Sequence, residues 1–356
     1  MNRDPILIRV DGTPATGWEH FSRCLTLAAA LQRRRRPTYF LSRLEPGFLG
    51  LNVKRGGNEW LEADNAIGTP EDLAETVQEI RRLNPAAVII DAPEANESYL
   101  SALRATGAVL VALDNQASIR FPARLVINPL LGPGKDAYMH EGGTQLLLGP
   151  RFALVRSEVR RVRPLRAQEP PQPFRALIAL GDDDPNRQSL ELAKLLLGVT
   201  RVARTDVVAR PYHPQLEELK ALAEANPDRL GVAVEPAEVA ARLARCHFAL
   251  SAGNTWSLEL ACIGVPQLVI VQAESHWPTA QRLEEEGAAV CLGWHASVSP
   301  GTIRQAIQDV LGDNLERLAM ARCGRKLIDG RGNDRLVTAL EIVLHPSRQV
   351  HLSDAA

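Results

Sequence analysis

Short apolar runs alternate with helix-like stretches along most of this chain of 356 residues. In the first half the apolar runs lie at 6–10, 38–41, 87–91 and 109–113, and the helix-like stretches at 20–32, 70–83 and 97–106. Runs that are apolar throughout are typical of strands buried on both faces, and strands separated by helices form parallel sheets. The first half therefore predicts a doubly wound α/β domain.

The same alternation returns in the second half. Strands are predicted at 176–180, 205–209, 231–234, 248–250 and 267–271, and helices at 189–197, 214–225, 237–244 and 256–263, followed by a helix-rich segment from 300 to 344. The intervening segment 160–173 is rich in arginine and proline, a composition typical of a linker. We expect an N-terminal domain over 1–159, a linker over 160–173, a C-terminal domain over 174–345 and a tail over 346–356. Two such α/β domains predict a ligand cleft at the carboxyl ends of their strands.

Composition narrows the classes of protein that this chain can belong to. Hydrophobic residues make up 45% and charged residues 23%, and the net charge of −1 gives no general attraction to nucleic acid or anionic membranes. The run from Arg33 to Arg36 follows a predicted helix and is interpreted as its solvated end. The five cysteines are scattered, as free thiols in a reducing compartment would be. With no apolar run long enough for a signal peptide or a membrane span, we expect a cytoplasmic protein.

One stretch points to a ligand class. A buried strand, a small-residue turn and a helix start follow one another through Ser251, Ala252, Gly253, Asn254 and Thr255. Free backbone N–H groups and the positive end of a helix converge at such a turn, which favours an anion. A carboxylate one turn further along, Glu259, is placed to accept hydrogen bonds from ribose hydroxyls. Together they predict a site for a nucleoside diphosphate.

Candidate acid–base residues follow other predicted strands. The long first loop contains Gly17 and delivers His20 at the start of a helix, where it is either a general base or a surface residue. Asp91 and Asp114 each end a strand, and either reach the cleft or cap the next helix. His276 follows the strand at 267–271 and is the second candidate acid or base.

Three consecutive acids, Asp182, Asp183 and Asp184, follow the first strand of the second half. They either bind a metal together with phosphate or form a turn that caps the next helix, and we favour the cap. The chain lacks the motifs of dinucleotide-binding, Walker A, zinc-hydrolase, dithiol and α/β-hydrolase proteins. We therefore predict neither a cofactor nor a metal.

Several segments are similar to a known family. They are Arg9-Val-Asp11, the stretch 20–28, the stretch 148–154, the turn 251–255 with Glu259, and 329–332. On these residues the chain resembles the UDP-sugar hydrolases of pseudaminic acid biosynthesis, which act on UDP-2,4-diacetamido-2,4,6-trideoxy-β-L-altropyranose. It also resembles spore-coat polysaccharide biosynthesis proteins and, more distantly, the N-acetylglucosaminyltransferase that makes lipid II.

The resemblance implies a GT-B fold, with two Rossmann-like domains and an interdomain cleft. It implies that the second domain holds a UDP-sugar through the turn 251–255, with Glu259 on the ribose, and that His20 is the catalytic histidine. Water activated by His20 would then attack the anomeric carbon, while the helix end stabilises the departing UDP.

The chain departs from this family on the sugar side. Trp18 and Glu19 stand in the loop where the family has a glycine, Pro93 replaces a tyrosine, and Glu274, Ser275 and His276 replace Glu-Asn-Gln. We interpret Gly17, Trp18, Asp91, Glu274 and Ser275 as substrate contacts. His20, Glu19 and His276 are the candidate catalytic residues.

Three functions follow from these residues. The first is a metal-independent hydrolase that releases UDP or another nucleoside diphosphate from an activated sugar in surface-glycan biosynthesis. The second is a GT-B glycosyltransferase, in which a sugar or protein hydroxyl replaces water. The third is a homologue that binds nucleotide-sugars without catalysis.

Overall fold

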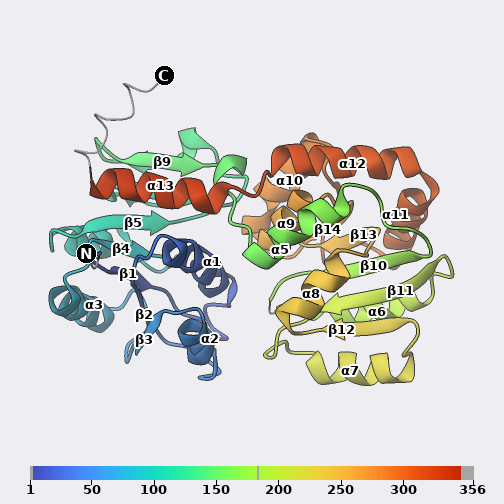
Figure 1. The fold of residues 1–356 in the computed structure, drawn as a ribbon, viewed down its shortest axis with the longest axis horizontal. Coiled ribbons are helices and arrows are strands. Elements are labelled where there is room, and N and C mark those ends of the chain that lie inside the picture. The colour runs from blue at the N-terminus through green and yellow to red at the C-terminus, as the bar shows by residue number, and fades with distance from the viewer. Residues whose placement is uncertain (1–2, 183, 346–356) are drawn as a thin grey trace. The chain divides into compact units, whose positions relative to one another are not determined.

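The computed structural model describes residues 3–182 and 184–345 and divides into two compact units. Among the described residues, unit 1 comprises 3–154 together with 331–345, and unit 2 comprises 155–330. Each unit is built around its own parallel sheet (Figure 1). Asp183 and the predicted tail 346–356 lie outside the described residues.

Unit 1 contains a seven-stranded sheet in its described part, in the order β3-β2-β1-β4-β5-β7-β9, with every neighbouring pair parallel. Its strands are β1 (Ile6–Arg9), β2 (Thr38–Ser42), β3 (Glu59–Glu62), β4 (Ala87–Ile90), β5 (Val109–Leu113), β7 (Leu125–Asn128) and β9 (Gln145–Leu148). Its helices are α1 (Glu19–Arg33), α2 (Leu49–Arg55), α3 (Pro70–Leu83), α4 (Glu97–Arg104) and α13 (Gly332–Leu344). The short strands β6 (Arg120–Phe121) and β8 (Met139–His140) pair separately.

Unit 2 contains a six-stranded parallel sheet in its described part, in the order β12-β11-β10-β13-β14-β15. Its strands are β10 (Phe174–Ala179), β11 (Val202–Val208), β12 (Leu230–Ala233), β13 (Phe248–Ser251), β14 (Gln267–Val271) and β15 (Val290–Trp294). Its helices are α5 (Ser157–Val162), α6 (Ser189–Leu197), α7 (Leu216–Ala225), α8 (Pro236–Leu243), α9 (Thr255–Ile263), α10 (Trp277–Glu285), α11 (Pro300–Gly312) and α12 (Asn314–Leu327).

The central strands are buried on both faces, as their unbroken apolar runs predicted. All four residues of β1, β4 and β13 are buried. Helix α3 begins where its sequence signal placed it, because the Thr69 side chain accepts the Asp72 backbone N–H at 3.2 Å and Pro70 needs no hydrogen-bond acceptor. The prediction of two parallel α/β sheets is therefore confirmed.

The prediction missed β7, whose four residues are all buried, and the peripheral strands β3, β9 and β15. β3, β9 and β15 are sheet edges, and none of the residues in these three strands is buried. Strands of this kind lack the continuous apolar run that identifies a central strand.

The segment predicted as a linker is folded onto unit 2. It holds the end of α5 and a 3₁₀ turn, and two of its arginines bind the carbonyl ends of helices. Arg166 donates to the carbonyl of Cys246 at 2.6 Å, and Arg163 donates to those of Arg325 and Ile328 at 2.8 and 2.9 Å. A guanidinium group suits the negative end of a helix, so an arginine-rich composition here reflects attachment rather than exposure.

The last described helix, α13, belongs to unit 1. The domain bounds predicted from the sequence placed it in the C-terminal domain, whereas the family resemblance implies that the C-terminal tail returns to the first domain. Arg36 is only 1% exposed and forms two hydrogen bonds from Nη2 to the Glu341 carboxylate, at 2.8 and 2.9 Å. Burial opposes ionisation of Glu341, but the hydrogen bonds and charge of Arg36 lower its pKa below the ordinary value. The interpretation of Arg36 as a solvated helix end is thus wrong.

Replacing Arg36 by methionine should lower the free energy of unfolding by about 1–3 kcal/mol, because a partly buried carboxylate loses its main partner. Arg33→Met is the matched control: its ion pair with Asp334 is 44% and 45% exposed, so the loss should stay within about 0.5 kcal/mol.

The Arg36 effect should also depend on pH. A lowered carboxyl pKa in the folded state stabilises the protein above the ordinary value of 4.5 and ceases to do so as the pH falls through the lowered pKa. Urea unfolding at about pH 7 and about pH 3 measures both predictions. Equal losses of unfolding free energy in Arg36→Met and Arg33→Met would contradict the stabilising role of Arg36. A loss in Arg36→Met that is the same at both pH values would also contradict it.

Candidate functional site

Each sheet reverses its strand order at one point, and the candidate residues gather there. In unit 1 the neighbours of β1 are β2 and β4, so the chain leaves β1 and β4 at the same carboxyl edge. In unit 2 the neighbours of β10 are β11 and β13, so the strand order reverses between β10 and β13. Side chains from the two loops at such a point face a shared crevice, where ligands bind in open α/β sheets.

In unit 1 the loop after β4 supplies Asp91 and the first turns of α1 supply His20 and Arg23. His20 Nδ1 lies 2.5 Å from Asp91 Oδ1. Arg23 forms a two-pronged pair with the same carboxylate, from Nε to Oδ2 at 2.6 Å and from Nη2 to Oδ1 at 2.5 Å. The Asp91 side chain is fully buried, while that of His20 keeps 19% of its surface exposed.

The surroundings of Asp91 keep it ionised. Burial alone would raise its pKa, but the charge of Arg23, the charge that His20 carries when protonated, and the hydrogen bonds from both residues lower it to about 2. A carboxylate is only an acceptor, so His20 must donate its Nδ1–H to it. The other ring nitrogen, Nε2, then carries the lone pair and can accept a proton. Asp91 does not cap the next helix, because Asn96 caps α4.

The loop before His20 is held by its own contacts. Gly17 has a φ of +71° and donates its N–H to the Thr13 carbonyl at 2.9 Å. Trp18 is 8% exposed, and its indole N–H donates to the Glu45 carbonyl at 2.8 Å. Glu19, half-buried, begins α1 beside His20. The loop is thus anchored by Trp18 and leads directly into His20, which pairs with Asp91.

Two other acidic residues at this edge of the sheet have structural roles. Asp11 binds the buried Arg9 and accepts the backbone N–H of Arg43 at 2.9 Å. Asp114 accepts the N–H groups of Gln116 and Ala117 at 3.0 and 2.7 Å, which is a turn.

Pro93, which replaces the family tyrosine, lines a mostly apolar hollow at the carboxyl ends of β4 and β5. The other residues that line it are Ile90, Ala92, Ala95, Leu100, Ala112, Leu113, Asp114, Ser118, Ile119 and Phe121.

In unit 2 the strand, turn and helix predicted around Gly253 are present as β13, the residues 252–254 and α9. Asn254 caps α9, accepting the Trp256 N–H at 3.1 Å and donating to the Leu180 carbonyl at 2.9 Å, which ties the turn to the end of β10. Gly253 has a φ of +80°, and a side chain there would come within 3.0 Å of the His276 carbonyl. Ser251 and Ala252 are fully buried beneath it.

Glu259 lies inside unit 2 and is bound by an arginine that the sequence analysis missed. Arg156 donates its backbone N–H to Glu259 Oε1 at 2.8 Å and its Nε to the same oxygen at 2.9 Å. Its guanidinium carbon lies 3.9 Å from the centre of the Trp256 ring. Glu259 has no exposed surface, so ribose hydroxyls reach it only if the Arg156 side chain shifts.

A second arginine lies near the same indole. Arg210 donates to Asp182 Oδ1 at 3.1 Å, and the Trp256 indole N–H donates to the same oxygen at 3.0 Å. Asp182 therefore lies at the start of α9. Asp184 accepts the Ser189 N–H at 2.7 Å at the start of α6, as the capping alternative predicted.

The loop after β14 approaches the turn through its backbone. Glu274, Ser275 and His276 form a 3₁₀ turn in which Glu274 is exposed and His276 is buried. Because the His276 carbonyl packs against Gly253, the structure brings this loop and the predicted anion site together. Within the described residues, no group of three or more histidine, cysteine or acidic side chains has the arrangement of a metal site.

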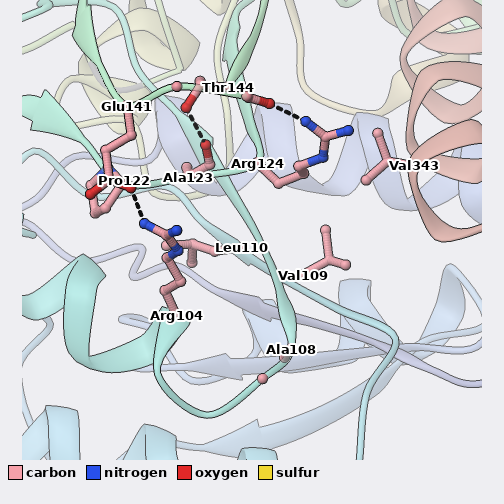
Figure 2. A pocket seen from close by; sticks show the side chains of 13 residues that line it. Arg104, Ala108, Val109, Leu110, Pro122, Ala123, Arg124, Glu141, Thr144 and Val343 are labelled. Carbon is pink, nitrogen blue, oxygen red and sulfur yellow. Dashed lines mark hydrogen bonds and ion pairs between the residues drawn. The ribbon is translucent and has the colours of Figure 1, made fainter.

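The pocket in Figure 2 belongs to the opposite edge of the unit 1 sheet. Its lining includes Ala108, just before β5, and Arg124, just before β7, with Glu141 paired to Arg104. It lies at the amino ends of these strands, away from His20 and Asp91.

No helix in the described ranges 3–182 and 184–345 is long and apolar enough to cross a bilayer.

Known proteins resemble the chain in sequence and in fold. No protein-family model matches it. It is 26% identical over 205 residues to the spore coat polysaccharide biosynthesis protein SpsG of Bacillus subtilis (strain 168), covering 57% of this chain and 58% of SpsG. The match therefore spans less than two thirds of that relative.

Two solved structures match nearly the whole chain. The spinosyn rhamnosyltransferase SpnG, complexed with thymidine diphosphate, has a TM-score of 0.67 at 16% identity, covering 95% of this chain and 100% of SpnG. MurG of Acinetobacter baumannii has a TM-score of 0.63 at 15% identity, covering 95% and 99%. The chain has the GT-B fold. The expected fold class is confirmed, and at these identities the likeness establishes the fold alone.

Proposed function

We propose that this protein transfers a sugar from a nucleoside diphosphate donor to an acceptor hydroxyl, with His20 as the general base. The observation that carries the proposal is the pairing of His20 with a buried, ionised Asp91. It leaves Nε2 as the proton acceptor on a partly exposed ring.

In this reaction unit 1 activates the acceptor. His20 Nε2 takes the proton of the acceptor hydroxyl while the oxygen of that hydroxyl forms a bond to the anomeric carbon. The bond from that carbon to the diphosphate oxygen breaks, and the nucleoside diphosphate leaves with the electron pair. Asp91 stabilises the imidazolium that results.

Unit 2 binds the leaving group. The turn 252–254 and the positive end of α9 suit a diphosphate, and Arg156 and Arg210 lie on either side of the first turn of that helix, near Trp256. Both guanidinium groups are paired with acids, Glu259 and Asp182, so a bound diphosphate must compete with these carboxylates. Backbone amides and two cations together stabilise the charge that develops on the departing phosphate.

The relatives favour transfer over hydrolysis. SpnG is named as a rhamnosyltransferase and has thymidine diphosphate bound, and the name of SpsG refers to spore-coat polysaccharide biosynthesis. These names support a TDP-sugar as donor and a glycan as acceptor, and the family resemblance adds a UDP-sugar as the alternative donor. Hydrolysis of a UDP-sugar is the same chemistry with water as acceptor.

The direct test is a panel of UDP-, TDP-, GDP- and CMP-sugars, each scored for free nucleotide with and without oligosaccharide acceptors. Release that requires an acceptor is expected. Release without one would replace the proposal by hydrolysis, and binding without turnover would leave a nucleotide-sugar-binding protein.

His20→Ala should reduce turnover by about 10²–10⁴-fold, the range for a positioned proton transfer. Donor affinity should barely change, because binding is assigned to unit 2. The exposed His140, whose ring nitrogen Nδ1 lies 3.0 Å from the Glu141 carbonyl oxygen, provides the control: His140→Ala should keep native turnover. Near-native turnover in His20→Ala would move the role to Glu19 or His276.

Glu259→Gln separates two roles for this carboxylate. If Glu259 binds ribose, the variant should lose affinity for uridine and UDP alike, by about 1–3 kcal/mol. If it acts by holding Arg156, only UDP should be affected, and Arg156→Met should reproduce the pattern. Calorimetry with both ligands makes the comparison. Unchanged binding of both by both variants would remove Glu259 and Arg156 from the nucleotide site.

A further inference from the structure

Arg23, on the first turns of α1, hydrogen-bonds within a small cluster that includes His20 and Asp91. Its guanidinium is 1% exposed, and Nε and Nη2 both bind Asp91, with His20 Nδ1 at 3.0 Å from Nη2. Its third nitrogen, Nη1, has no hydrogen-bond partner among the described residues. The effect of Arg23 is therefore exerted through the Asp91–His20 pair.

The charges of the buried Arg23–Asp91 pair cancel, so protonating His20 adds a positive charge beside a carboxylate that Arg23 already neutralises. The other titratable groups near Arg23 are Glu19, whose negative charge acts on Arg23 with or without a protonated His20, Cys24 on α1, and Tyr138 just before β8. Burial raises the pKa of the Cys24 thiol and of the Tyr138 hydroxyl, so both stay neutral. Without Arg23, a lone buried carboxylate would favour the imidazolium, which cannot accept a proton.

We propose that Arg23 is a positioning residue that keeps His20 a neutral base, by cancelling the charge of Asp91 and fixing its oxygens against Nδ1–H. The consequence for turnover rests on the proposed function. The protonation state of the ring does not, and it can be measured in the ligand-free protein.

The test follows the His20 ring in ¹⁵N-labelled full-length protein by long-range ¹H–¹⁵N correlation across a pH titration, with signals assigned from His20→Gln. The native ring, when neutral, should show Nδ1–H with Nε2 unprotonated. In Arg23→Met the imidazolium should persist to a pH higher by about one unit or more. Arg23→Lys retains the charge and should titrate near the native ring. Arg33→Met, at the exposed end of α1, should not change the titration.

Arg23→Met leaves a buried carboxylate unpaired, so the double variant Arg23→Met with Asp91→Asn provides a second comparison. It removes both charges, and His20 should titrate within about half a unit of the native ring, whereas Asp91→Asn alone should lower the midpoint by about one unit or more. A folded Arg23→Met with a native His20 titration, or equal midpoints in Asp91→Asn and the double variant, would overturn the inference.

A second test measures turnover, and it depends on the proposed function. The acid limb of the pH–rate profile of Arg23→Met should move upward by the same interval as the ring titration, with KM for the donor unchanged. A moved ring titration in a protein that turns over no donor would reject the proposed function and leave the role of Arg23 standing. A moved ring titration with an unmoved acid limb would reject His20 as the base.

Discussion

Parallel pairing of strands around one reversal point in each sheet is the constraint on which the candidate site depends. Because β1 pairs with β2 on one side and β4 on the other, the loops after β1 and β4 leave the sheet side by side. His20 and Asp91, 71 positions apart, meet for this reason. The same geometry in unit 2 joins the turn after β13 to the end of β10, through the bond from Asn254 to the Leu180 carbonyl.

Buried arginines are the second recurring element, and they act in three ways. Arg23 sets the charge of a carboxylate beside a histidine, and Arg36 fastens α13 to unit 1 through Glu341. Arg166, in contrast, lies among backbone carbonyls, and burial lowers its pKa. An arginine stays charged even so, because its ordinary pKa is so high. It can therefore satisfy helix ends inside the protein where a lysine would tend to lose its proton.

The substitutions on the sugar side have a local structural meaning. Trp18 takes a buried position and binds the Glu45 carbonyl, so the bulky residue stabilises the loop that carries His20. Pro93 is one of the mostly apolar residues that line the small hollow at the carboxyl ends of β4 and β5.

The sequence alone was enough to determine the central elements. Apolar runs identify the buried strands other than β7, Thr69 and Pro70 mark the start of α3, and small residues at 251–255 mark the turn before α9. Edge strands such as β3 and β15 escaped prediction because, without buried residues, their sequences lack the pattern of a central strand.

Only the tertiary structure decided which charged residues became partners. Arg23 with Asp91, Arg156 with Glu259 and Arg36 with Glu341 are 68, 103 and 305 positions apart. A local pattern shows that a residue is charged but not whether a distant segment will bury it. For that reason the sequence predicted a solvent-exposed Arg36 and a linker over residues 160–173, and it gave no sign that Arg156 would pair with Glu259. The physical reason is that hydrogen-bond partners for a buried charge are supplied by packing, which depends on the order of strands in the sheet and not on neighbouring residues in the chain.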